Sequence, residues 1–294
     1  MDTRPCKAKT IAVLSGKGGT GKTLISVNLA CAAGSAVYMD CDAEEPNGHL
    51  FFKPRDLSSQ MVYVPVPQVD PALCDGCREC VDFCAFHALA WAGGKLLVFD
   101  ELCHGCGGCM MVCPNGALTE KGRKIGEIQH GTSQGISVHS GFLDPGEASG
   151  VPIIKALLEQ AKDIEESTLI IDCPPGSSCL VSESIRDADY CLLVAEPTRF
   201  GAHNLEMVHA LVRLYGKPCG AVLNKCLPGR DPSEEYCLSH GIPVLARIPF
   251  DEKLGLLNAN GKIAVREDAQ YQTIFVRLLE EIDRETAHAA VGHS

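Results

Sequence analysis

The chain has 294 residues, enough for one large domain and a small additional one, and 46% of them are hydrophobic. Its net charge of −11 argues against general nucleic-acid binding, because contact with phosphates needs a basic surface. No segment offers the roughly 18 uninterrupted apolar positions of a membrane span, so we expect no membrane insertion. Residues 1–10, MDTRPCKAKT, lack the apolar core of a secretory signal, which predicts a cytoplasmic location.

Apolar runs of strand length alternate with segments of helical spacing along most of the chain. The predicted strands are residues 10–15, 36–40, 61–66, 136–143, 168–173, 190–196, 219–226 and 243–250. The predicted helices are residues 23–33, 152–164, 178–188 and 204–216, with a final helix within 268–287. This alternation indicates an α/β fold with a mostly parallel, doubly wound sheet covered by helices on both faces.

The composition changes between residues 67 and 120, where the chain becomes rich in cysteine and glycine. The α/β pattern resumes after residue 120. We therefore interpret 67–120 as a small domain inserted into a loop of a discontinuous α/β domain that comprises residues 1–66 and 121–294.

Residues 16–23, GKGGTGKT, match the phosphate-binding pattern G-x-x-x-x-G-K-[ST] between a predicted strand and a predicted helix. Glycines let the backbone curl so that successive N–H groups face the phosphates at the start of the helix. Lys22 is expected to reach the β- and γ-phosphates, and the Thr23 hydroxyl to bind Mg²⁺. The predicted nucleotide contacts of this loop are Gly16, Lys17, Gly18, Gly19, Thr20, Gly21, Lys22 and Thr23.

The loop contains a second lysine, Lys17, and so resembles the MinD/ParA/nitrogenase-iron-protein branch of P-loop ATPases, whose loop reads K-G-G-x-G-K-T. The resemblance implies ATP and Mg²⁺ as cofactors and a nucleotide-dependent dimer, either a homodimer or a heterodimer with a similar ATPase. It also implies that Lys17 crosses the dimer interface to the partner's phosphates and acts like an arginine finger on developing charge.

Two carboxylates one residue apart, Asp40 and Asp42 in YMDCDAEEPN, follow the second predicted strand, where a doubly wound sheet places its ligand. The resemblance implies that Asp40 lies in the Mg²⁺ shell, that Asp42 orients the attacking water, and that Asp172 in LIIDCPPG holds Mg²⁺ through water. Asn224 in LNK and Pro249 in IPF match positions that flank adenine in relatives. The alternatives are a solvated loop for the two aspartates, and ordinary strand-end and turn residues for Asn224 and Pro249.

Residues 74–84, CDGCRECVDFC, and 103–113, CHGCGGCMMVC, share the spacing C-x2-C-x2-C-x3-C of two-cluster bacterial ferredoxins. In that pattern three close cysteines hold one [4Fe–4S] cluster and the fourth points toward the other. The predicted ligands are Cys74, Cys77, Cys80 and Cys113 for the first cluster, and Cys84, Cys103, Cys106 and Cys109 for the second. Zinc is the alternative, although its sites usually use cysteine pairs. One departure from the ferredoxin pattern is Ala85 after the first group, where Pro114 follows the second.

Taken as a whole, the chain resembles MinD-superfamily ATPases with an inserted ferredoxin domain. That resemblance favours an ATPase that couples nucleotide-driven dimerisation to electron transfer through two [4Fe–4S] clusters to a redox partner. The alternative is an ATP-dependent assembly or delivery factor for an iron–sulfur or Mo/Fe cofactor, working with a metal-cofactor-binding protein. A MinD-like role in spatial positioning is disfavoured, because the acidic segment 276–294 opposes binding to an anionic bilayer.

Overall fold

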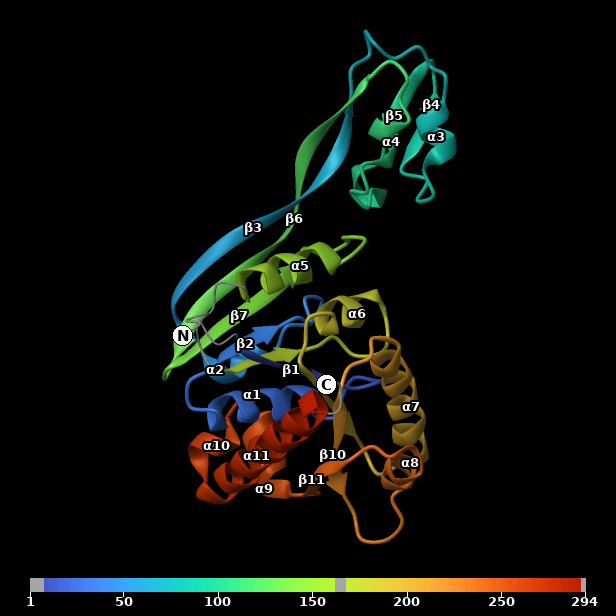
Figure 1. The fold of residues 1–294 in the computed structure, drawn as a ribbon. Helices are drawn as coiled ribbons and strands as arrows, with labels where there is room; N and C mark the ends of the chain where they lie inside the picture. Colours follow the sequence, from blue (N-terminus) through green and yellow to red (C-terminus); the bar gives the residue numbers. More distant parts are fainter. Residues whose placement is uncertain (1–7, 162–167, 292–294) are drawn as a thin grey trace, which may run out of the picture.

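The main sheet has nine strands in the order β11-β10-β9-β1-β8-β2-β7-β6-β3 in the computed structural model, which describes residues 8–161 and 168–291 (Figure 1). The strands are β1 (Lys9–Leu14), β2 (Val37–Asp40), β3 (Arg55–Val69), β6 (Leu118–Ser133), β7 (Ile136–Leu143), β8 (Thr168–Asp172), β9 (Tyr190–Ala195), β10 (Cys219–Cys226) and β11 (Val244–Pro249). All neighbours from β11 to β7 pair in parallel, whereas β6 pairs antiparallel with both β7 and β3. The prediction of a mostly parallel α/β sheet is therefore confirmed.

Helices cover both faces of the sheet, because successive residues of each strand point to opposite sides. The helices are α1 (Lys22–Ala32), α2 (Gly48–Phe52), α5 (Val151–Gln160), α6 (Cys179–Ile185), α7 (Arg199–Leu214), α8 (Pro232–His240), α9 (Glu252–Ala259), α10 (Ala264–Glu267) and α11 (Ala269–Val291). On β1, Ile11 and Val13 pack in the core covered by α1, α2, α9, α10 and α11. Ala12 and Leu14 point to the other face and pack in the core covered by α5, α6, α7 and α8. Residues 162–164, the end of the predicted helix 152–164, lie outside the described residues. Residues 1–7, on which the prediction of a cytoplasmic location partly rests, also lie outside them.

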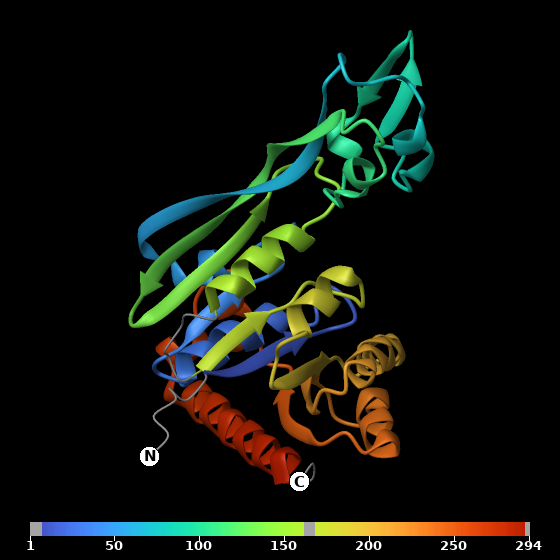
Figure 2. The same ribbon diagram turned by 45° about the horizontal axis from the view of Figure 1, so that its top comes forward.

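Strands β3 and β6 form a long antiparallel ribbon that leaves the body of the molecule (Figures 1 and 2). Its pairing extends to Val69 and Leu118, across the predicted boundaries at 66/67 and 120/121. The predicted strand 61–66 is only part of β3. Residues 55–61 of that strand are exposed and largely polar, so they form no apolar run in the sequence.

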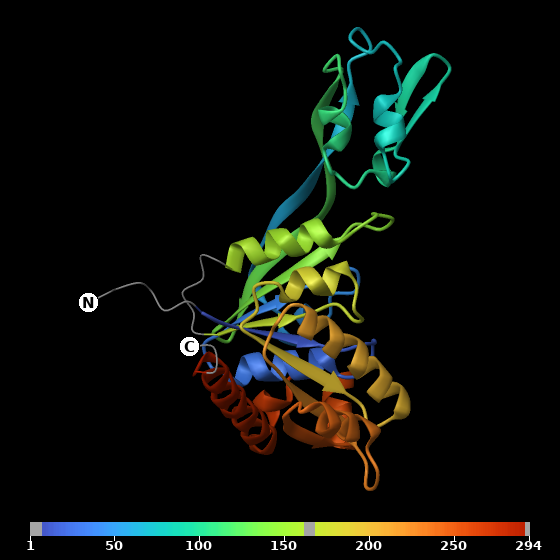
Figure 3. The ribbon, with the colours of Figure 1, turned by 45° about the vertical axis from the view of Figure 1, so that its right-hand side comes forward.

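A small cysteine-rich unit sits at the far end of the ribbon, beyond the body in all three views (Figures 1, 2 and 3). It contains α3 (Glu79–Phe83), β4 (Leu89–Ala92), β5 (Lys95–Val98), the 3₁₀ helix η1 (Asp100–Leu102) and α4 (Gly108–Met111). Strands β4 and β5 form a two-stranded sheet of their own. Leu89 and Leu118 pack with Cys80 and Cys109 in a separate small core. The unit thus has its own packing and is held at a distance by the ribbon.

The ribbon is anchored to the body where β6 passes close to β7. A Cβ atom at Gly126 would lie 2.1 Å from the backbone oxygen of Phe142 and 2.7 Å from Cδ1 of Ile153. Backbone cannot yield to such a contact as a flexible side chain can. The close approach of the two strands therefore requires glycine at this position.

We expect Gly126→Ala to lower the free energy of unfolding by about 1–3 kcal/mol, the usual cost of forcing an extra methyl group into a packed site. Gly122→Ala on the same strand is the control, because its Cβ would make an ordinary contact with Tyr63 at 3.6 Å. Its effect should stay within about 0.5 kcal/mol. Urea unfolding followed by circular dichroism measures both, and equal losses would contradict the steric explanation.

Candidate functional site

A cleft of about 750 Å³ opens at the carboxyl edge of the parallel strands, around the loop that joins β1 to α1. The predicted residues on its wall are Lys17, Gly18, Gly19, Gly21, Lys22, Thr23, Asp42, Asn224 and Pro249. Four other predicted residues, Gly16, Thr20, Asp40 and Asp172, do not line the cleft. Gly16 lies against α7, where a Cβ would be 2.2 Å from the backbone oxygen of Asn204. The structure thus gathers most of the predicted nucleotide contacts around one opening.

The loop is held by a side chain from β10, the strand beyond β9 in the sheet. Asn224 Nδ2 donates to the backbone oxygen of Thr20 at 2.7 Å. The same amide leaves no room for a side chain at Gly21, whose φ is 95°. The Thr20 hydroxyl is buried and has no hydrogen-bond partner among the described residues. An orphaned buried hydroxyl is unusual, and it fits a loop whose polar groups are completed by a bound ligand.

Lys22 and Asp172 form a buried ion pair behind the loop. Lys22 Nζ lies 3.0 Å from Asp172 Oδ1, with the side chains 8% and 1% exposed. Burial lowers the pKa of Lys22, but the carboxylates of Asp172, Asp42 and Asp40 together outweigh burial and leave this pKa raised. The hydroxyl of Tyr38 on β2 donates to the other carboxylate oxygen of Asp172 at 2.9 Å. Tyr38 was not predicted, although a tyrosine within a buried strand needs a polar partner for its hydroxyl.

A second ionic group surrounds Lys17. Its Nζ lies 2.7 Å from Glu196 Oε2, and Lys225 Nζ lies 2.6 Å from the other oxygen, Oε1. Burial opposes ionisation of Glu196, but hydrogen bonds from the two lysines prevail and lower the pKa of this carboxyl. Lys225 also donates to the backbone oxygen of Gly19 at 2.7 Å. Glu196 and Lys225 were missed. The sequence signal that could have identified them is that each is a charged residue near the carboxyl end of a predicted buried strand.

The two aspartates after β2 have different environments. Asp40 is 1% exposed, and its carboxylate accepts backbone N–H groups of Asp42, Asn47 and Gly48 at 3.2, 3.0 and 2.8 Å. Burial, with Asp172 nearby, raises the pKa of Asp40 to about 8. Asp42 faces the cleft, and burial raises its pKa to about 6 against the opposing effect of Lys22. Asp40 therefore orders the loop that presents Asp42, and a direct role for Asp40 at Mg²⁺ stays a prediction.

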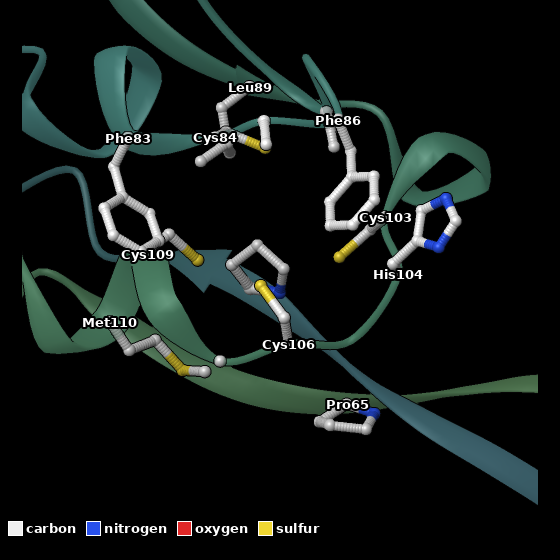
Figure 4. Close-up of a pocket in the computed structure, with 14 residues that line it drawn as sticks. Pro65, Phe83, Cys84, Phe86, Leu89, Cys103, His104, Cys106, Cys109 and Met110 are labelled. Carbon is white, nitrogen blue, oxygen red and sulfur yellow. The ribbon is translucent and has the colours of Figure 1, made fainter. Parts of the chain in front are cut away.

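The cysteine-rich unit contains two cavities, and every cysteine in the described residues is free. The first cavity, about 20 Å³, is lined by Cys74, Cys77, Cys80 and Cys113. The second, about 230 Å³, is lined by Cys84, Cys103, Cys106 and Cys109, whose sulfurs point inward (Figure 4). Each cavity thus receives three cysteines of one group and the fourth of the other. This grouping coincides with the two predicted ligand sets.

Two further facts bear on what the cysteine cavities can bind. The backbone N–H of Ala117 donates to Cys113 Sγ at 3.3 Å. Among residues 8–161 and 168–291, no three histidine, cysteine or acidic side chains converge as the ligands of one metal ion would.

The loop, the cleft at the carboxyl edge and the sheet order define a nucleotide-binding P-loop protein. Residues 11–265 match the model of the CobQ/CobB/MinD/ParA nucleotide binding domain, and the chain belongs to this family. The MinD/ParA-type ATPase predicted from the loop is thereby confirmed at the level of the family. Within the described part of the chain, no helix has the length and apolar character needed to cross a membrane.

Two relatives and one solved structure are similar to the chain. The chain is 30% identical over 260 residues to the "Uncharacterized protein MJ0578" of Methanocaldococcus jannaschii, covering 86% of this chain and 92% of that protein. It is 29% identical over 219 residues to MJ0579 of the same organism, covering 73% and 79%. The fold is similar to that of the septum site-determining protein MinD from Pyrococcus horikoshii complexed with Mg-ADP, with a TM-score of 0.59, 18% identity and coverage of 94% and 96%.

We expect Tyr38→Phe to lower the free energy of unfolding by about 1–3 kcal/mol, because it removes the donor to a fully buried carboxylate oxygen. Tyr190→Phe is the matched control, since the Tyr190 hydroxyl is buried without a hydrogen-bond partner among the described residues. That variant should be neutral or slightly stabilising. Guanidinium unfolding of both measures the difference, and equal costs would show that Tyr38 matters only for packing.

Proposed function

We propose that the chain is an ATP-hydrolysing iron–sulfur protein, in which nucleotide-driven dimerisation is coupled to electron transfer through two [4Fe–4S] clusters to a partner protein. The observation that carries the proposal is the sorting of eight cysteines into two cavities, each with three cysteines from one group and the fourth from the other. The ATPase part of the proposal rests on membership of the nucleotide-binding family.

The cleft supports ATP with Mg²⁺ as the ligand, and the fold neighbour from Pyrococcus horikoshii is complexed with Mg-ADP. Lys22 would exchange its ion pair with Asp172 for one with the phosphates, which frees Asp172 to hold Mg²⁺ together with Thr23. Lys17 would leave Glu196 and reach the phosphates bound by the second subunit. Asp42, which lines the cleft, would orient the attacking water.

The donor set of each cavity fits a [4Fe–4S] cluster better than zinc. A cluster binds one thiolate at each iron corner and so needs four cysteines spread around a space, whereas zinc needs four ligands that converge on one ion. The described cysteines are free, and the second set lines a space of about 230 Å³. The first set lines only about 20 Å³, room for about one water, so its loops would have to move apart to admit a cluster. When bound, the clusters supply one-electron redox chemistry. The chain's own contribution is the thiolates, and the Ala117 N–H that donates to Cys113 Sγ and favours negative charge there.

The lysines of the loop test the ATPase mechanism. We expect Lys22→Ala to abolish ATP binding, because it removes the main phosphate contact, and Lys17→Ala to leave binding intact but lose most hydrolysis. Isothermal titration with a non-hydrolysable ATP analogue measures binding, and phosphate release measures turnover. Asp42→Ala should behave like Lys17→Ala. Normal turnover of Lys17→Ala would eliminate the proposed action across the dimer interface.

A cysteine substitution tests cluster binding, and the redox state of the clusters tests the coupling of ATP hydrolysis to electron transfer. We expect Cys106→Ser to lose one of two clusters, seen as half the iron and acid-labile sulfide per chain after anaerobic reconstitution, with ATP affinity unchanged. In the unaltered protein, the rate of Mg-ATP hydrolysis should change severalfold between oxidised and reduced clusters. Cys179→Ser, an exposed cysteine outside both sets, is the control for iron content. A hydrolysis rate independent of redox state would contradict coupled electron transfer.

A second candidate function is ATP-dependent delivery of a metal cofactor. It is favoured by the exposure of one cysteine in each set, Cys77 and Cys106, which gives an apo acceptor access to both cavities. Incubation of the loaded protein with an apo-ferredoxin and ATP distinguishes the two functions. ATP-dependent movement of iron and sulfide to the acceptor supports delivery, whereas retention of both supports electron transfer.

A further inference from the structure

We propose that the rim of the second cysteine cavity is the docking surface for a basic protein that accepts one electron. We call this surface the docking rim and define it by the side chains Phe83, Phe86, His104 and Met110, which surround the cavity of Cys84, Cys103, Cys106 and Cys109. The inference rests on the proposed function, since it assumes that the cavity holds a cluster.

The docking rim exposes aromatic rings that are already fixed in place. Phe83 and Phe86 are 52% and 43% exposed. Phe86 stacks on His104 with ring centroids 3.8 Å apart, and the ring of Phe83 covers Gly108, where a Cβ would be 2.2 Å away. Figure 4 shows the two phenylalanines on opposite sides of the cavity with the sulfurs between them. Clustered, immobilised aromatic rings are typical of contact sites, because little side-chain entropy is lost on binding.

The first cavity offers no comparable surface. Its space is only about 20 Å³, and the Trp91 ring covers the loop at Gly76, where a Cβ would be 2.7 Å from the indole. Apolar contact with a partner is therefore available at the second cavity, whereas one ring covers the first.

The charge of the unit selects the kind of partner. Residues 67–120 contain two basic side chains, Arg78 and Lys95. The acidic side chains of the same segment are Asp70, Asp75, Glu79, Asp82, Asp100, Glu101 and Glu120. A basic protein is attracted to such a surface and oriented by it, whereas a second copy of this acidic unit is repelled. Charge therefore favours a basic partner over self-association.

The electron transfer balances as a one-electron exchange. The partner's one-electron centre is reduced while the cluster site at the docking rim returns to its oxidised state, and a low-potential reductant then restores it. The ribbon holds the unit beyond the body of the molecule that contains the nucleotide cleft (Figure 3).

Cytochrome c, a small basic haem protein, serves as the acceptor in the test. The reconstituted protein is reduced with dithionite, freed of excess reductant and mixed with oxidised cytochrome c in a stopped-flow instrument at low ionic strength. Phe86→Lys is compared with Leu73→Lys, which makes the same charge change beside the first cavity at a position of similar exposure, 43% against 50%. We expect Phe86→Lys to lower the second-order rate constant by about tenfold and Leu73→Lys by less than about twofold.

The possible results distinguish failure of the docking rim from failure of the proposed function. Equal slowing by both variants would assign the attraction to diffuse charge, and slowing by Leu73→Lys alone would move docking to the first cavity; either result overturns the docking rim. A dimer of the unaltered protein that Phe86→Lys abolishes would identify a second copy as the occupant and also overturn it. Iron and sulfide are measured first, because a chain that binds no clusters refutes the proposed function and the docking rim together. If Phe86→Lys loses iron, Phe83→Lys replaces it, since Phe83 lines the same cavity and is 52% exposed.

Discussion

The buried ion pair between Lys22 and Asp172 ties together the parts on which nucleotide binding depends. It joins the first residue of α1 to the last residue of β8, and Tyr38 links the same carboxylate to β2. Removing one member of a buried pair leaves an uncompensated charge, which costs about 3–5 kcal/mol. The loop, the central strands and the edge of the cleft are therefore held in one arrangement by this ion pair. In the proposed mechanism, a phosphate ligand would compete with Asp172 for Lys22, and binding would move the lysine.

A continuous set of backbone hydrogen bonds leads from the cleft to the ribbon. The loop that Asp40 orders contains Asp42 and Ala43, and the Ala43 oxygen accepts the N–H of Leu143 at 2.9 Å. The next residue, Asp144, donates to the oxygen of Ile125 on β6 at 2.9 Å. Contiguity alone does not couple two sites. Coupling requires that nucleotide binding favour one of two arrangements of these segments. The two hydrogen bonds make the loop of Asp42 and Ala43 the element through which such a change would pass to the ribbon.

Features encoded by local patterns were predicted best. The loop at 16–23 is a short pattern with fixed spacing, and the sheet follows from strands that are buried on both faces. The two cysteine groups are equally local patterns, and their role as cluster ligands stays a prediction. The ribbon was underestimated because residues 55–61 are exposed and carry no apolar run. Tyr38 and Asp172 are 134 residues apart, so their contact depends on sheet order, which no local pattern contains. The same holds for Glu196, whose partners are Lys17 in the loop after β1 and Lys225 near the end of β10.

The distance between the two kinds of site follows from what each must contact. In the proposed dimer, the cleft face with Lys17 would be covered by the second subunit, and a large partner would have to bind elsewhere. The proposed redox partner would need an open surface close to a cluster, because electron transfer through protein weakens steeply with distance. The extension of β3 and β6 well beyond the body is compatible with both requirements (Figure 2). The base of the ribbon stays bonded, through β7, to the loop that presents Asp42.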